Sequence, residues 1–227
     1  MISLNDNTLT SEKLTEEVLS LTVESGKVVA ENHLHLRKLV KVRISKFGPN
    51  CDLNDIDVSQ VTNMSNLFYR SEFNGNISEW DVSNVEDMHN MFYGSNFNGD
   101  ISKWNVSSVE DMNGMFYRSK FTGDISGWDT SNAKDMEYMF AFSEFNKDIS
   151  RWNTSNVKGM KYMFAFSKFN GDISKWDVSN VKDMRGMFQE SKFNNNISNW
   201  DISHVGDMRY MFEGSPLAGK EPSWYKE

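Results

Sequence analysis

The sequence is poor in cysteine, proline and basic charge, and it has no long apolar run. Its single cysteine, Cys51, excludes a disulfide framework within the chain. No apolar run approaches the roughly 20 residues of a transmembrane helix, so we expect no membrane span. The 227 residues include 24 Lys and Arg against 32 Asp and Glu, a net charge of −8. Such a chain lacks the basic surface that phosphate neutralisation requires, which argues against a nucleic-acid-binding protein.

The first residues of the chain carry neither a basic nor an apolar stretch, so no secretory signal is visible. From the sequence as written we therefore expect a cytoplasmic protein. A surface or phage-associated location is the alternative, if the chain is a fragment or is exported by another route.

Tryptophan, phenylalanine and methionine are abundant by contrast, with 7, 16 and 14 copies. The tryptophans recur every 24 residues, and a fixed period of this size is the signature of a solenoid of stacked units. Seven units run from Ile56 to about Ser223, and their apolar positions recur, so we predict one continuous core. The tryptophans are Trp80, Trp104, Trp128, Trp152, Trp176, Trp200 and Trp224.

Spacing within one unit predicts a strand and then a helix. Ile77-x-x-Trp80-x-Val82-x-x-Val85 matches the strand pattern of leucine-rich repeats, so residues 79–82 are expected to pair with their copies in a parallel sheet. The apolar residues that follow have helical spacing. We therefore predict an α/β solenoid, a leucine-rich-repeat-like right-handed coil of seven 24-residue repeats with parallel strands on its concave face and short helices on its convex face. The turn back to the strand is expected to place glycine at positive φ, at Gly75, Gly99, Gly123 and Gly171.

The N-terminal part does not follow the repeat. We predict residues 1–52 as a mainly helical cap and residues 53–227 as the solenoid with a short C-terminal cap. A first helix is expected after Thr10 or Ser11, a turn between two short strands at residues 24–27, and a second helix from Asn32 to about Phe47.

The second helix is strongly basic. It carries five basic residues and no acid, and subtracting this +5 from the net −8 leaves −13 on the other residues. Such a helix is either a membrane- or partner-binding element or a cap with a solvated basic face. The basic residues are Arg37, Lys38, Lys41, Arg43 and Lys46.

The repeated motif Phe-Asn-Gly-Asp-Ile-Ser-Lys-Trp-Asp-Val-Ser-Asn-Val resembles the repeat of BspA-like leucine-rich-repeat surface proteins. The resemblance covers residues 52–223. It implies a leucine-rich-repeat fold and a surface or adhesin-like role, and it brings no catalytic motif.

Polar columns follow from the repeat. Asp or Asn comes after each tryptophan from Trp80 to Trp200, and on the predicted strand this column lies on the exposed concave face. A column copied along the whole scaffold does not indicate a catalytic pair, and no loop has the ligand spacing of a calcium motif, so we predict no enzyme, no metal and no cofactor. A second column, beginning at Asn74 and Asn98, is expected to bond turn backbones in adjacent units. The candidate concave strip comprises Asp81, Lys103, Asn105, Asp129, Arg151, Asn153, Lys175 and Asp177.

Function in a repeat protein is expected where copies differ on an exposed face. Tyr138 and Phe142, with Tyr162 and Phe166 one unit later, are four residues apart and would share a helix face. They either form a partner site or fold onto neighbouring turns.

We predict a non-enzymatic protein-binding module with a rigid repeat surface. The alternative is an adhesin-type surface or phage-associated protein that binds host protein or glycan, and self-association through the aromatic patch is a further possibility.

Overall fold

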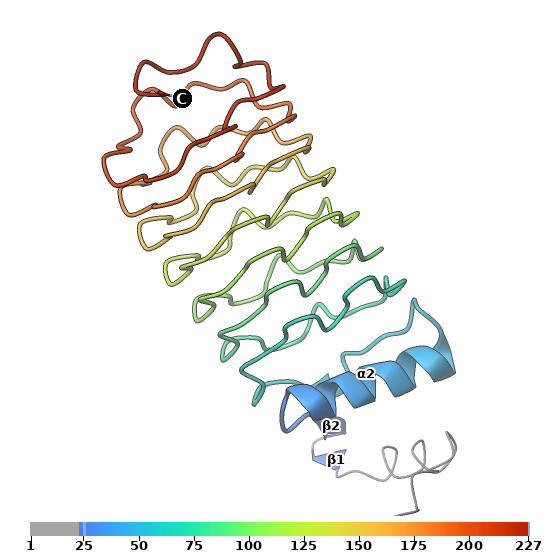
Figure 1. Ribbon diagram of the computed structural model, residues 1–227. Coiled ribbons are helices and arrows are strands. Elements are labelled where there is room, and N and C mark those ends of the chain that lie inside the picture. The colour runs from blue at the N-terminus through green and yellow to red at the C-terminus, as the bar shows by residue number, and fades with distance from the viewer. Residues whose placement is uncertain (1–22, 25, 227) are drawn as a thin grey trace, which may run out of the picture.

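The computed structural model describes residues 23, 24 and 26–226, and it shows 24-residue coils stacked in one elongated row (Figure 1). The helix α2, His33–Phe47, covers the N-terminal end of the row. A small sheet lies beside it, in which β1 (Val23–Glu24) pairs antiparallel with β2 (Lys27–Val29) and β2 pairs parallel with β3 (Ile56–Asp57). This sheet joins the N-terminal segment to the first coil.

The N-terminal cap agrees with the sequence where it is described. The Asn32 side chain accepts a hydrogen bond from the His35 backbone and begins α2, and Gly48 ends it with a positive φ of 85°. The predicted second helix is therefore confirmed, as is the turn that joins β1 to β2 around Gly26. The helix expected after Thr10 or Ser11 lies outside the described residues. Three residues of α2 are buried in the same core as the coils: Leu36, Leu39 and Val40.

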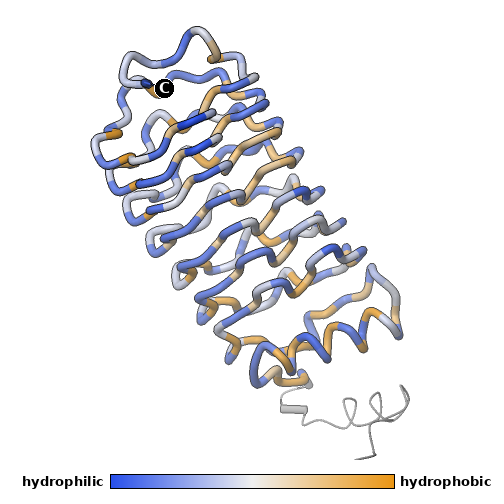
Figure 2. The backbone as a smooth tube through the Cα atoms, in the orientation of Figure 1, coloured by the Kyte–Doolittle hydropathy of each residue, from blue (hydrophilic) through white to orange (hydrophobic). Residues whose placement is uncertain are grey.

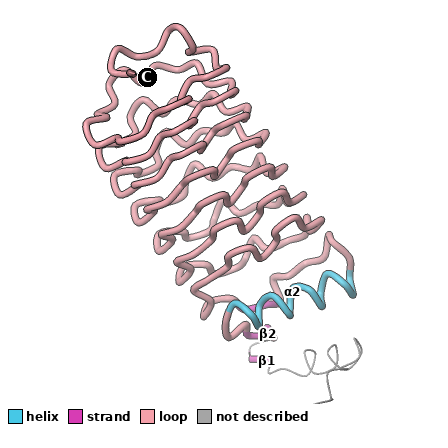
Figure 3. The backbone as a smooth tube through the Cα atoms, in the orientation of Figure 1, coloured by secondary structure: helices cyan, strands magenta, loops and turns pink. Residues whose placement is uncertain are grey.

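Only the first of the described coils has a strand at the predicted place, β3, and the described residues after it contain neither the strands nor the helices that the repeat spacing predicts (Figure 3). Over the described residues after β3, parallel pairing is limited to isolated bridges, such as Asp87 with Asp111, and residues 79–82 carry none. The reason lies in the backbone hydrogen bonds. The Trp80 amide donates to Ile77 within its own coil, so it is not offered to a neighbour.

The segment predicted as helical is instead a run of tight turns. The amides of Met88, Asn90 and Phe92 donate to carbonyls in the next coil, at Asp111, Asn113 and Met115. Alternate amides of the same segment donate within the coil, as from Met91 to Met88. A helix needs every amide to bond four residues back, and here half of them bond across coils. Bonding between coils therefore replaces the expected helix.

The interior consists of columns of identical side chains, one from each coil, and apolar residues recur at matching places along the tube (Figure 2). The rings of Trp128 and Trp152 lie 6.3 Å apart and nearly parallel, and each indole also donates to a carbonyl of the previous coil. The predicted continuous core is confirmed, because the apolar columns are buried from coil to coil. Two phenylalanine columns stack beside the tryptophans, and Phe116 and Phe140 are 5.6 Å apart.

The glycine prediction was wrong. Gly75, Gly99, Gly123 and Gly171 do not have positive φ. They stand in crowded surroundings instead: an added Cβ at Gly99, Gly123 or Gly171 would come within 2.9 Å of a phenylalanine ring, and one at Gly75 would lie 1.9 Å from the Cys51 carbonyl oxygen. The equivalent residues of two other coils are Lys147 and Asn195, so the turn accepts a side chain there, and crowding restricts the position most at Gly75, where the neighbour is backbone.

Candidate functional site

The four residues of the candidate aromatic patch lie on the surface of two adjacent coils. The rings of Phe142 and Phe166 stack at 4.5 Å, and those of Tyr138 and Tyr162 at 5.3 Å. The Tyr117 ring contacts one ring of each pair, with its centroid 6.3 Å from that of Tyr138 and 5.4 Å from that of Phe142. The structure thus brings the predicted residues together, although they lie on turns and not on a shared helix face.

The patch is part of a longer surface feature that sequence reasoning missed. Five rings lie side by side along the row of coils, with centroids 4.7, 4.5, 5.4 and 4.5 Å apart; all neighbours are stacked except the third pair, whose rings are tilted by 58°. The sequence does contain a sign of this feature. Three consecutive units have a tyrosine at the same position, and the next two units have a phenylalanine one position later in the unit. Because of that shift, a simple alignment of the units does not place the five aromatic residues in one column. We call this feature the aromatic row; its members are Tyr69, Tyr93, Tyr117, Phe142 and Phe166.

Two arginines accompany the aromatic row. The Arg70 guanidinium lies 5.3 Å from the Tyr69 ring centre and 5.8 Å from that of Tyr93. Arg118 lies 5.5 Å from Tyr117 and 4.7 Å from Phe142. A cation over the edge or face of several rings adds attraction and keeps its positive charge available at the surface.

The backbone at the patch is held in an unusual conformation. Phe142 and Phe166 have φ of 58° and 55°, and Tyr138 and Tyr162 have 58° and 54°. A left-handed backbone favours glycine or asparagine and costs other residues about 1–3 kcal/mol. The conformation recurs at the equivalent position of the other coils, so it belongs to the repeated turn and is not confined to the aromatic residues. The equivalent residues are Arg70, Gly94, Arg118, Glu190 and Gly214.

The candidate concave strip is exposed, and its Asp and Asn residues have a local structural role. The carboxylates of Asp81, Asp129 and Asp177 each accept a hydrogen bond from the serine amide two residues on, and the amide side chains of Asn105 and Asn153 do the same. Hydrogen bonds from Ser131 and Ser179 lower the pKa of Asp129 and Asp177. These residues close a turn in every coil. Their basic neighbours are exposed and form no ion pair with another described residue: Lys103, Arg151 and Lys175.

The predicted amide column is confirmed as a link between coils. The side-chain oxygens of Asn74, Asn98, Asn146 and Asn170 each accept a hydrogen bond from a backbone amide one coil later, at 2.8 Å. Backbone groups of the turns are thereby satisfied, which is the role expected of them.

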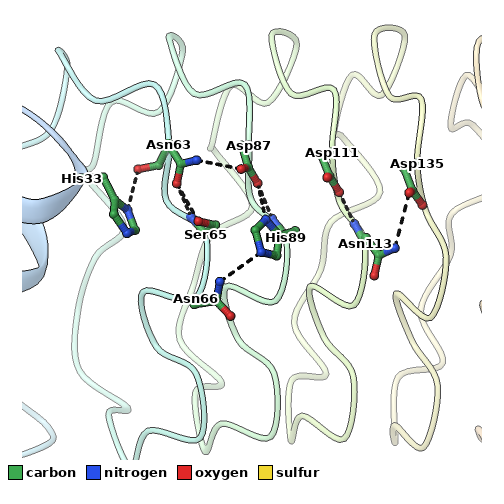
Figure 4. A network of polar contacts seen from close by, with 9 residues as sticks. All are labelled: His33, Asn63, Ser65, Asn66, Asp87, His89, Asp111, Asn113 and Asp135. Carbon is green, nitrogen blue, oxygen red and sulfur yellow. Dashed lines mark hydrogen bonds and ion pairs between the residues drawn. The ribbon is translucent and has the colours of Figure 1, made fainter.

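A polar network that the sequence did not indicate lies near α2 (Figure 4). Asn63 donates to Asp87 at 2.7 Å, and His89 contacts Asp87 through Nδ1 at 2.9 Å. The Asn66 amide nitrogen is 3.0 Å from His89 Nε2, so the proton of the neutral ring lies on Nδ1 and is donated to Asp87. The network is joined to α2 by the His33 ring at the Asn63 carbonyl oxygen.

In the described part of the chain, ligand atoms of Asp87, His89 and Asp111 lie within 4.8 Å of one another, a set that fits a divalent metal by residue type. Both nitrogens of His89 and both carboxylate oxygens of Asp87 already have hydrogen-bond partners in the network. The hydrogen bonds thus account for the arrangement.

Replacing Asp111 with asparagine is expected to stabilise the protein at neutral pH. Burial raises the pKa of Asp111, and the carboxylates of Asp135 and Asp87 raise it further. A raised pKa in the folded state means that ionisation opposes folding above that pKa. Asp111→Asn keeps an oxygen for the Asn113 amide, so the melting temperature should rise by about 1–3 °C at pH 7. The gain should vanish as the pH falls below the ordinary value of 3.8.

Asp129→Asn is the matched control, since the pKa of Asp129 is lowered in the folded state and its ionisation favours folding. Thermal unfolding followed by circular dichroism between pH 3 and pH 7 compares the two variants. Stabilisation of both, or of neither, would contradict the assignment of Asp111 as a buried, repelled carboxylate.

The fold and this surface define a repeat protein made of stacked coils. The chain belongs to the family described as Mycoplasma protein of unknown function, DUF285, whose model matches residues 40–144 and 119–224. No curated protein and no solved structure matches the chain. Within the described residues, no helix has both the length and the apolar character that a membrane crossing requires.

Proposed function

We propose that the chain is a non-enzymatic interaction protein that binds another protein through the aromatic row. The observation that carries the proposal is the exposure of two stacked rings, those of Phe142 and Phe166, beside Arg118. The two residues are 40% and 44% exposed, and the Arg118 guanidinium lies 4.7 Å from the Phe142 ring centre. Exposed aromatic residues beside arginine are typical of binding hot spots.

The absence of catalysis is part of the same proposal. Carboxyl groups with lowered pKa, such as Asp129 and Asp177, are accounted for by hydrogen bonds within turns. Burial raises the pKa of the Cys51 thiol, which disfavours the nucleophilic thiolate. We therefore assign these groups no role in a reaction.

We further propose that the coil is a variant of the BspA-like leucine-rich repeat, in which pairing between coils falls on isolated bridges such as Asp87 with Asp111 and not on residues 79–82. Membership of the repeat family and the 24-residue unit support this. If the coil is such a repeat, the alternative function is that of an adhesin-type surface or phage-associated protein. Stacking favours a protein over a glycan as the partner, because each ring of the row faces its neighbours and the open ring face that a sugar needs is largely covered.

The double variant Phe142→Asn/Phe166→Asn is expected to lose the partner and keep the fold. Asparagine accepts the left-handed backbone, which offsets the lost ring stacking, so the free energy of unfolding should change by less than about 1 kcal/mol. Affinity capture from lysate and envelope fractions, read by mass spectrometry, compares the variant with the wild type.

Tyr210→Asn is the control, because Tyr210 is also exposed and left-handed, with φ of 63°, but lies outside the aromatic row. A partner captured equally by the wild type and the double variant would exclude the aromatic row as the binding site. A partner lost also with Tyr210→Asn would show a general effect of removing surface rings.

A further inference from the structure

The aromatic row leads into a groove beside α2. Tyr69, the first ring of the row, lines a groove of about 590 Å³ between α2 and the first coil, a volume in the range of ligand sites. Its apolar lining comes from both sides, so the groove exists only because α2 lies against the coil. The apolar side chains, besides Tyr69, are Leu34, Val40, Ile44 and Leu67.

The groove is also basic. Arg37, Lys38 and Lys41 line it, all three are exposed, and none forms an ion pair with another described residue. Arg43, on the same helix, differs because it pairs with Asp55. The open basic charge is thus concentrated on the side of α2 that faces the groove.

Charge changes sign along the surface. Arg70 and Arg118 continue the positive charge from the groove along the aromatic row, and neither pairs with a described acid. Beyond Phe166 the equivalent position is Glu190, which is hydrogen-bonded through its backbone to Glu213. Along the column of equivalent positions that holds both arginines, a ligand therefore meets cations and rings first and an acid only at Glu190.

We propose that the basic groove and the aromatic row form one binding surface for an extended acidic peptide segment that also carries apolar side chains. The proposal rests on the proposed function and names the chemistry of its partner. Carboxylates of the segment contact Arg37, Lys38, Lys41, Arg70 and Arg118, and its apolar side chains enter the groove and lie against the rings. Charge complementarity of this kind directs both association and orientation.

A peptide fits this surface better than an anionic membrane does. Val40 is buried in the groove and Ile44 and Leu67 are half-buried, whereas a flat bilayer requires apolar side chains on a protruding face, which on α2 only Leu34 and Phe47 offer.

The test is selection from a phage-displayed library of random peptides of about 12 residues, a length that spans about 40 Å when extended. We expect wild-type protein to enrich sequences that combine Asp or Glu with Leu, Phe or Trp. Binding of an enriched peptide, measured by fluorescence anisotropy, should weaken about tenfold for Lys38→Glu/Lys41→Glu and should fall with added salt. The matched control, Lys158→Glu/Lys182→Glu, reverses two exposed lysines away from the groove and should bind as the wild type does.

Three results would overturn the proposal: enriched peptides without an excess of acid, equal binding by both double variants, or no enrichment at all. Sedimentation with phosphatidylserine vesicles is run in parallel. Vesicle binding that depends on Lys38 and Lys41, without peptide binding, would assign the groove to a membrane. The proposed function fails separately, because it depends on capture through Phe142 and Phe166 and not on the lysines of α2.

Discussion

Trp152→Ala is expected to lower the free energy of unfolding by about 3–5 kcal/mol, a large part of the stability of a domain this size. Trp152 is 3% exposed and lies between two other indoles, 6.3 Å from Trp128 and 6.4 Å from Trp176. Its indole N–H donates to the Ile125 carbonyl at 3.1 Å. Truncation therefore opens a cavity, removes two stacking contacts and takes away one of the two donors to the Ile125 carbonyl, which keeps the hydrogen bond from the Trp128 amide. Urea unfolding followed by circular dichroism measures the loss.

Two variants separate these contributions. Trp152→Phe keeps a ring in the column but not the N–H, and should cost about 1–3 kcal/mol. Trp224→Ala removes a half-buried indole at the last coil that makes the same bond, to Ile197, and should cost less than Trp152→Ala because it has a neighbouring coil on one side only. A larger loss for Trp224→Ala would mean that the tryptophan column is not what couples the coils.

Gly75→Ala is expected to destabilise the protein by about 2–4 kcal/mol, and the loss should be concentrated at the junction with α2. The added Cβ would lie 1.9 Å from the Cys51 carbonyl oxygen and 2.7 Å from the Phe73 ring. Because the first of these is backbone, the clash cannot be relieved by a side-chain rotation and has to shift the coil. Urea unfolding gives the size of the loss, and amide hydrogen exchange in α2 gives its location.

Gly127→Ala is the matched control, because an added Cβ there meets nothing within 4 Å and its φ is not positive. It should be neutral or slightly stabilising, since alanine restricts the unfolded chain. Gly123→Ala should be intermediate: its nearest contact is the Phe121 ring at 2.8 Å, and backbone is 3.7 Å away. Equal effects at the three positions would contradict close approach as the reason for glycine.

The core was predictable from the sequence because burial depends on which positions recur. The 24-residue period identified every tryptophan column member, and Trp104, Trp128 and Trp176 are each 4% exposed. The bonding of the coil was not predictable in this way. The spacing of the apolar residues after Val85 fits a helix and a run of turns equally well. The choice between them depends on the neighbouring coil, because its carbonyls at Asp111 and Asn113 accept the hydrogen bonds that a helix would form within itself.

The candidate site was predictable in part. Tyr138, Phe142, Tyr162 and Phe166 are brought together, since near-identical consecutive units must place equal residues side by side. Tyr117 was missed because it stands one position earlier in its unit and reaches Phe142 only across the stack. Its place in the row follows from ring geometry, which a one-dimensional alignment of units does not contain.

The hydrogen bonds between coils have a consequence for how such a molecule changes over generations. Each amide from Met136 to Phe142 that leaves its coil bonds to the next coil and to no coil beyond it. If the gene loses or gains the coding sequence of one whole repeat, each remaining amide therefore still finds an equivalent carbonyl in the coil that follows it. The units around Phe142 and Phe166 share the run Tyr-Met-Phe-Ala-Phe-Ser, as a recent copying event would leave them. Unequal recombination can thus lengthen or shorten the exposed ring array in single steps, which makes the number of units a heritable variable of this surface.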